Sequence, residues 1–144
     1  MRRIVIPAVL AGTAIIGAAV ASAQDNSGKR IRVSLEGEVE VPVQGDPDGT
    51  GTATIRVNPG QGQLCYTISV SGIAPATAAH IHEAPAGSQG GVVVGLTAPT
   101  GGSSSGCVAI DRQEALDIIR EPENYYINVH NTPFPGGALR AQLG

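Results

Sequence analysis

The three histidines of this chain are the residues best suited to chemistry. His80 and His82 stand in the segment 79–85, and His130 stands in the segment 125–131. Residues two apart in an extended strand point to the same side and lie about 6.7 Å apart, so the first two imidazoles can reach toward one metal-sized point. A third imidazole from a neighbouring strand would complete a facial set of three nitrogen ligands. Such a set with an open position suits Cu(II) or Zn(II), and copper should bind more tightly than zinc.

A structural use of the same histidines is the competing interpretation, because a histidine in a strand often only hydrogen-bonds to the backbone. In the segment 125–131, alternation predicts that Tyr125, Ile127 and Val129 form the buried face, which leaves Asn128 and His130 on the other face. Both a metal site and a hydrogen-bonded cluster remain open from the residues alone. Asn128 and Glu83 are candidate partners behind the ligands, and Glu83 can equally be a solvated charge.

The elements that must position these residues read as strands. Most of the chain alternates apolar and polar residues with period two, as in strands that have one buried face. The expected strands lie at about 31–36, 38–43, 52–57, 64–70, 79–83, 92–96, 107–110, 124–130 and 138–143. Seven to nine short strands with turns between them predict an all-β, antiparallel, Greek-key-like β-sandwich.

A single short helix is expected between the strands. Asp111 can cap it and Glu114 can complete a capping box, and the apolar stripe that follows stops before Pro122. The stretch 101–106, which contains only glycine and serine, is expected to be a flexible loop.

The first residues indicate export. A short basic start precedes an apolar run, and Ala21-Ser22-Ala23 resembles a signal-peptide cleavage site, so residues 1–23 are predicted to be a secretory signal peptide. A membrane anchor is the weaker alternative, because Pro7 and two glycines break a run of marginal length. Residues 24–30 are expected to be flexible and residues 31–144 to form one domain. We expect a secreted monomer, periplasmic or extracellular, with no membrane association after cleavage.

Charge and cysteine content narrow the partners. Removal of Arg2 and Arg3 with the signal peptide takes the formal net charge from −3 to −5, so no nucleic-acid partner is expected. Cys65 and Cys107 are an even number of cysteines in a chain predicted to be exported, and we expect a disulfide between them. Two unpaired buried thiols are the alternative.

Six motifs in order carry a family resemblance. The chain resembles the CHRD (chordin) domain across nearly all of the predicted mature region, in the motifs Gly-Thr-Ala-Thr at 51–54, Leu-Cys-Tyr-Thr-Ile at 64–68, Ala-His-Ile-His at 79–82, Gly-Gly-Val-Val-Val at 90–94, Asn-Tyr-Tyr-Ile-Asn-Val-His at 124–130 and Phe-Pro-Gly-Gly-Ala-Leu-Arg-Ala-Gln-Leu at 134–143. The resemblance implies an extracellular β-sandwich module. One departure is Glu83-Ala84-Pro85, where such domains often have Gly-Pro directly after the second histidine.

A weaker resemblance bears on chemistry. His-Ile-His-Glu at 80–83, Asn-Val-His at 128–130 and Gly-Gly-Ala-Leu-Arg at 136–140 are similar in order to the copper half of copper/zinc superoxide dismutases. That resemblance would make the three histidines copper ligands and Arg140 a guide for an anion. The chain lacks a fourth histidine and a zinc-binding cluster, so an ordinary bimetallic dismutase is excluded.

Three functions therefore follow from the sequence. The first is a secreted, non-enzymatic binding module that holds copper, or else zinc, through the three histidines. The second is a copper-dependent, dismutase-like redox enzyme. The third is a purely structural or protein-interaction domain with an extracellular protein partner that the sequence does not identify.

Overall fold

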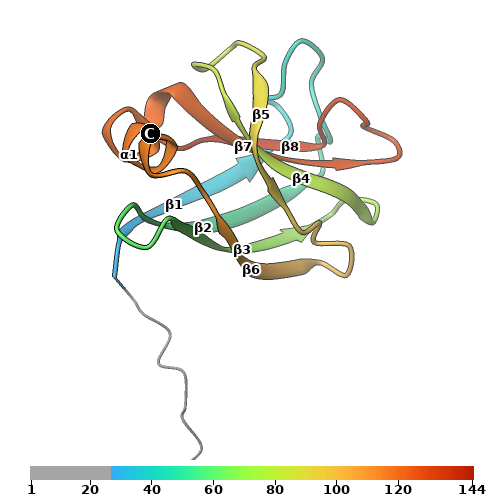
Figure 1. Cartoon of the computed structure of the whole chain (residues 1–144). Coiled ribbons are helices and arrows are strands. Elements are labelled where there is room, and N and C mark those ends of the chain that lie inside the picture. The colour runs from blue at the N-terminus through green and yellow to red at the C-terminus, as the bar shows by residue number, and fades with distance from the viewer. Residues whose placement is uncertain (1–26) are drawn as a thin grey trace, which may run out of the picture.

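The computed structural model describes residues 27–144, which form an all-β fold with one short helix (Figure 1). The elements are β1 (Lys29–Glu36), β2 (Thr50–Asn58), β3 (Gln63–Ser71), β4 (Ala76–Glu83), β5 (Gly91–Leu96), β6 (Ser103–Ala109), α1 (Arg112–Arg120), the 3-10 turn η1 (Pro122–Asn124), β7 (Tyr125–Asn131) and β8 (Leu139–Gln142). The predicted fold class, with seven to nine strands and one helix, is confirmed. The expected signal peptide, 1–23, lies outside the described residues.

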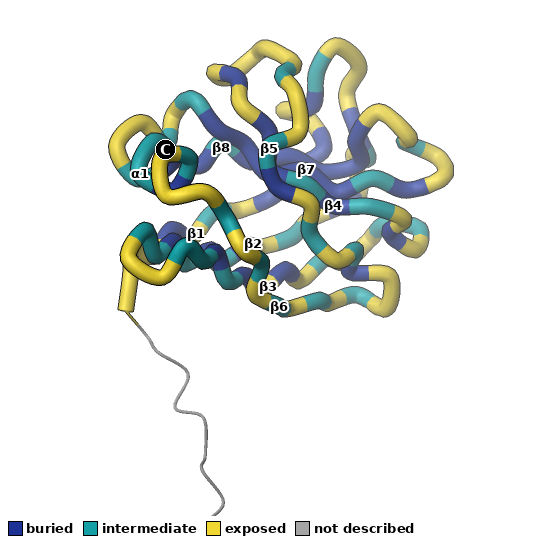
Figure 2. The backbone as a smooth tube through the Cα atoms, viewed as in Figure 1, coloured by how far each residue is buried: buried dark blue, intermediate teal, exposed yellow. Residues whose placement is uncertain are grey.

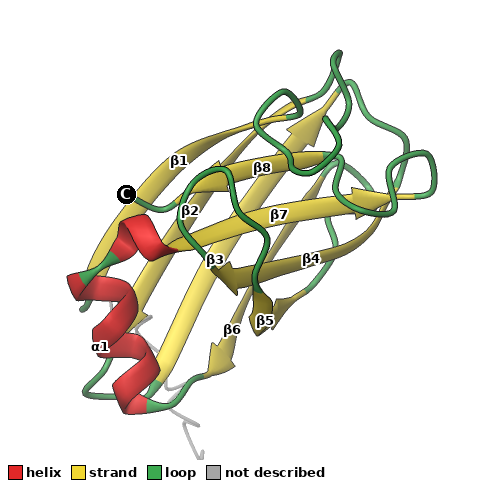
Figure 3. Ribbon diagram, turned by 90° about the horizontal axis from the view of Figure 1, so that it is seen from above, coloured by secondary structure: helices red, strands yellow, loops and turns green. Residues whose placement is uncertain are grey.

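The eight strands form one antiparallel, nearly closed sheet in the order β5-β4-β7-β8-β1-β2-β3-β6. The sheet folds into two layers, with β1, β2, β3 and β6 below and β4, β5, β7 and β8 above (Figure 1). The layers join where β8 meets β1, and that junction contains a single paired position, Glu36 opposite Arg140. Viewed from above, the strands of the two layers cross, as in a sandwich (Figure 3).

The apolar core lies between the two layers, and most of the buried positions are in the strands, with β7 buried along nearly its whole length and β6 with no buried residue (Figure 2). Period two accounts for the burial in β2 and β3, because alternate residues of these strands are buried and the residues between them are not. α1 covers one end of the sandwich with Ala115 and Ile118, and Asp111 caps it by accepting from two backbone amides, as predicted.

Two local predictions are wrong. The segment 38–43 is a loop, and Val39 and Val43 are 47% and 76% exposed. The chain turns back here because the Gly37 carbonyl accepts from the amides of Glu40 and Gly45, and Pro42 has no amide hydrogen for a strand ladder. The expected flexible loop at 101–106 instead enters β6 at Ser103, where it pairs with β3.

The predicted disulfide is present. Cys65 of β3 and Cys107 of β6 are directly opposite each other and are bonded, with Cα atoms 4.0 Å apart. The bond ties β6, at the end of the sheet, to its neighbour β3. Within the described residues, no helix is long and apolar enough to span a membrane.

Three loops cover the outer face of β4, β7 and β8. They are the β1–β2 loop (37–49), the β4–β5 loop (84–90) and the β7–β8 loop (132–138), and the first and third are joined by a hydrogen bond from the Asp46 amide to the Ala138 carbonyl. Beneath them lie polar side chains that are nearly inaccessible to solvent: Glu40, His82, Asn128 and Arg140. The domain therefore has a second, polar core outside the apolar one.

Candidate metal centre

Strand pairing brings the histidines together on this outer face. In the β4–β7 ladder, His80 is opposite Asn128, His82 is opposite Tyr126, and His130 is opposite Ala78. Directly paired residues of antiparallel strands point to the same side, so the two segments that contain all three histidines meet side chain to side chain. The adjacency of β4 and β7 is the fact that the sequence alone could not supply.

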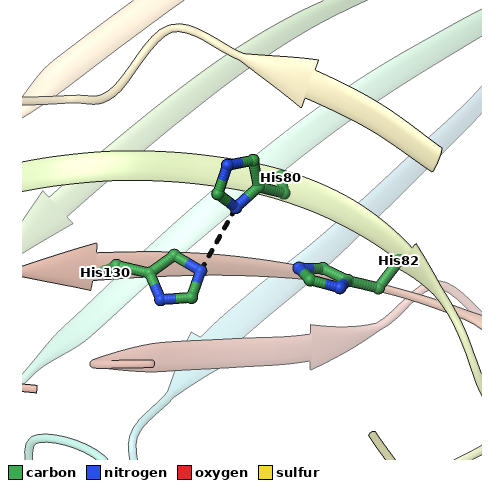
Figure 4. Close-up of side chains that lie close together, drawn as sticks. All are labelled: His80, His82 and His130. Carbon is green, nitrogen blue, oxygen red and sulfur yellow. Dashed lines mark hydrogen bonds between the residues drawn. The ribbon is translucent and has the colours of Figure 1, made fainter. Parts of the chain in front are cut away.

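The three imidazoles converge as predicted (Figure 4). One ring nitrogen from each of His80, His82 and His130 lies within 4.8 Å of the others. The Nδ1 atom of His80 is 3.2 Å from the Nε2 atom of His130. His82 is buried, whereas His80 and His130 are half-buried, so the cluster is reached from solvent on their side.

Backbone carbonyls select one tautomer for two of the rings. The Nδ1 atom of His82 lies 2.9 Å from the Gly90 carbonyl oxygen, and that of His130 lies 3.0 Å from the Pro135 carbonyl oxygen. A carbonyl can only accept, so each Nδ1 carries the hydrogen and the lone pair of the neutral ring is on Nε2. Metal-binding histidines in proteins are commonly held in this way.

Gly90, whose carbonyl contacts His82, has to be a glycine. A Cβ atom on Gly90 would collide with the backbone carbonyl of Glu83. The close approach of the β4–β5 loop to β4 places the Gly90 carbonyl over His82, and the Gly90 amide also lies 3.3 Å from the Tyr126 hydroxyl. Gly90 is thus a sequence signal for the geometry of the site, whereas a Cβ atom on Gly91 would meet nothing.

The pKa values of two histidines favour the neutral, metal-binding form. Burial lowers the pKa of His80, and the neighbouring His130 and His82 lower it further. Burial also lowers the pKa of His130, although the hydrogen bond to the Pro135 carbonyl acts to raise it. Neutral imidazole is the form that binds a metal ion.

Asn128 lies at the centre of the cluster. Its Oδ1 atom is 3.0 Å from the Nε2 atom of His82 and 3.1 Å from the Nε2 atom of His130. The side chain of Asn128 also hydrogen-bonds to the carboxyl group of Glu40, which accepts a further bond from the Val41 amide. Asn128 therefore connects two histidines to a buried carboxyl group.

Glu40 is the functional residue that sequence reasoning missed. It is 4% exposed, and burial raises its pKa to about 7 although Arg140 acts to lower it. Its segment reads as a strand with outward glutamates, so alternation gives no indication of burial. The only signal is Gly137, where a Cβ atom would collide with the Glu40 carboxyl group.

Comparison with known families agrees with this architecture. The family model of the CHRD domain matches residues 31–143. This chain belongs to the CHRD domain family. Neither the comparison with curated proteins nor the comparison with solved structures finds a match.

Arg140 of this CHRD domain lies behind Tyr126, not at the nitrogen cluster. Its guanidinium carbon is 3.5 Å from the centre of the Tyr126 ring, and the opposite contact of that ring is a parallel stack with His82 at 4.7 Å. Nη2 is 2.8 Å from the Ser88 carbonyl, and among the described residues Nη1 has no hydrogen-bond partner. The tyrosine separates the guanidinium from the imidazoles.

Glu83 of the CHRD domain also lies away from the histidines. It follows His82 in a regular part of β4, so its side chain leaves the opposite face. It is exposed, and its charge acts on Glu114 and Tyr125, whose pKa values are both raised chiefly by burial. Of the three candidate partners named from the sequence, Asn128 is the one that contacts the cluster.

Proposed function

We propose that this CHRD domain binds one divalent transition-metal ion through His80, His82 and His130, and that it binds copper more tightly than zinc. The observation that carries the proposal is the convergence of one nitrogen from each ring within 4.8 Å. Nitrogen donors follow the Irving–Williams order, in which Cu(II) is bound most strongly.

The distances fit a metal ion after a small adjustment. Two nitrogens that each lie 2.0–2.1 Å from one tetrahedral ion are about 3.3 Å apart. The 3.2 Å separation of His80 Nδ1 and His130 Nε2 already has this value. The widest separation in the cluster, at most 4.8 Å, has to shorten by about 1.5 Å at most. Rotation of the half-buried His80 ring can supply such a change, because among residues 27–144 its ring nitrogens have no hydrogen-bond partner other than His130.

The proposed setting is outside the cytoplasm. The predicted signal peptide and the Cys65–Cys107 disulfide both suit an oxidising compartment. We propose a secreted, monomeric module whose ligand is the metal ion. Under the same proposal, an extracellular protein partner would recognise the domain with its metal ion bound.

Calorimetric titration of the metal-free protein tests the proposal. Cu(II) and Zn(II) should each bind once per chain, and the double variant His80→Ala, His82→Ala should lose at least 100-fold in affinity. Glu83→Ala is the matched control, because this exposed residue adjoins His82 but leaves the other face of β4. Equal binding by the wild type and the double variant would reduce the histidines to a structural cluster.

The competing function is that structural cluster, and the His80–His130 contact of 3.2 Å favours it when it is taken as a hydrogen bond. Dismutase-like chemistry has less support. Arg140 is 2% exposed and lies behind Tyr126, so it does not present its charge to an anion at the nitrogens. We expect little superoxide dismutation by the copper-loaded protein, and unchanged activity in an Arg140→Lys variant.

A further inference from the structure

We infer that Asn128 is the fourth ligand of the metal ion, through its side-chain oxygen, and that Glu40 orients it. This inference rests on the proposed function, because it needs an ion held by the three histidines. It changes the character of the site. Three nitrogens leave a position open for a substrate, whereas three nitrogens and an amide oxygen form a closed, four-coordinate set.

The position of the amide oxygen is that of a ligand. Asn128 Oδ1 lies 3.0 Å from His82 Nε2 and 3.1 Å from His130 Nε2. Donor atoms that share one tetrahedral ion at 2.0–2.2 Å are about 3.3–3.6 Å from one another. His130 Nε2 thus has two neighbours within a few tenths of an ångström of this spacing, the Asn128 oxygen at 3.1 Å and His80 Nδ1 at 3.2 Å.

The hydrogen count of the cluster indicates a position for a cation. The ring of His82 lies between two acceptors, the Gly90 carbonyl and Asn128 Oδ1, and the ring of His130 lies between the Pro135 carbonyl and the same Oδ1. A neutral imidazole has one N–H group and can donate to only one of its two acceptors. With both hydrogens on Nδ1, the Nε2 lone pairs of His82 and His130 both face the lone pairs of the amide oxygen. His80 Nδ1 can donate to His130 Nε2, but among the described residues no such donor faces His82 Nε2, and a metal ion at that point satisfies the two nitrogens and the oxygen at once.

Glu40 explains why the oxygen of Asn128, and not its NH2 group, faces the rings. The amide side chain hydrogen-bonds to the buried Glu40 carboxyl group, and an ionised carboxylate can only accept. When Glu40 is ionised, the NH2 group therefore points to it and leaves the oxygen toward the histidines. A carboxylate behind the amide also increases the negative charge on that oxygen, as second-shell carboxylates do for ligating histidines.

A crystal structure of the zinc-loaded wild-type protein is the direct test. A separation of about 2.0–2.2 Å between Asn128 Oδ1 and the ion, with all three histidines bound, supports the inference. An ion bound by the histidines with Oδ1 more than about 3 Å away and water in the fourth position overturns the inference but leaves the proposed function intact. A wild-type protein that takes up no zinc overturns both.

An exchange of the two side chains provides a second, independent test in solution. Asn128→Ala should weaken Co(II) and Zn(II) binding by about 10- to 100-fold. The double variant Glu40→Gln, Asn128→Asp should restore binding to at least the wild-type level, because it keeps an oxygen donor at the ion, the same total charge and a hydrogen bond between the two groups. Asn124→Ala, in η1, is the control for loss of an asparagine elsewhere.

A different result is expected if Asn128 does not bind the ion and only donates hydrogen bonds to the histidine rings. An ionised aspartate has no N–H group, so the double variant would then bind no better than Asn128→Ala, and the inference would fail. The absorption bands of Co(II) report the same change independently of affinity. Four-coordinate bands in the wild type and the double variant, with weaker or shifted bands in Asn128→Ala, are the expected result.

Discussion

Replacement of Glu40 by glutamine should change how the stability of the metal-free protein depends on pH. The carboxyl group is 4% exposed, and burial raises its pKa from 4.5 to about 7. The folded state therefore holds the proton more tightly than the unfolded state does. Stability is highest below about pH 4.5 as far as this group is concerned, and it falls as the pH rises through 7. Glutamine is neutral throughout and keeps an acceptor for Asn128, so the variant should lack this dependence.

The size of the effect follows from the pKa difference. One pKa unit corresponds to about 1.4 kcal/mol, so a rise of this size gives a maximum of about 3 kcal/mol. Relaxation of the loop around the ionised group reduces the cost, and we expect about 2 kcal/mol. For a domain of this length, about 2 kcal/mol corresponds to roughly 8 °C in melting temperature.

Urea unfolding at several pH values between 4.5 and 8, with a chelator present, measures the effect. The free energy of unfolding of the wild type minus that of Glu40→Gln should fall by about 2 kcal/mol across this range. Contributions from the histidines cancel in the difference, because both proteins contain them. Glu38→Gln, an exposed carboxyl in the same loop, should run parallel to the wild type. If Glu40→Gln also runs parallel to the wild type, Glu40 does not titrate as a buried acid and the reasoning is refuted.

Three further predictions concern the metal, the disulfide and the amino terminus. The pKa values of His80 and His130 are lowered, so protons compete less with the metal ion for the ring nitrogens. Cu(II) affinity, measured by titration, should therefore persist to a pH below the usual imidazole range near 6.5. A loss of affinity that begins well above about pH 6.5 would contradict this. The bond between Cys65 and Cys107 closes a loop of 42 residues, and its replacement by two alanines should lower the free energy of unfolding by up to about 4 kcal/mol, whereas an unchanged urea midpoint would refute a stabilising role. Mass spectrometry of the exported protein should find Gln24 first and two hydrogens fewer than in the reduced chain, and a chain that begins at Met1 would exclude cleavage.

The sequence was sufficient for properties that depend on local backbone geometry. Alternation with period two placed His80 and His82 on one side of a strand, and Asn128 and His130 on the side of β7 that faces away from Ile127. Both assignments follow from the pleat of a single strand, in which successive side chains point to opposite faces. The cap at Asp111 is likewise a matter of the few residues around it.

The sequence failed where a segment alternates but finds no partner strand. Residues 38–43 have the pattern of a strand with outward glutamates, yet they form a loop in which Glu40 is buried and Val43 is 76% exposed. Alternation predicts which residues share a side, but the choice of the side that is buried depends on what lies against it. Here the β7–β8 loop and Asn128 lie against Glu40.

The site itself was decided by contacts between distant parts of the chain. The sequence determined which residue types could bind a metal and on which side of its own strand each one lies. The tertiary structure decided that β4 and β7 are neighbours, that the carbonyls of Gly90 and Pro135 orient two of the rings, and that Glu40 lies behind Asn128. Strand order and loop burial result from the packing of the whole domain, and no period in a single strand encodes them.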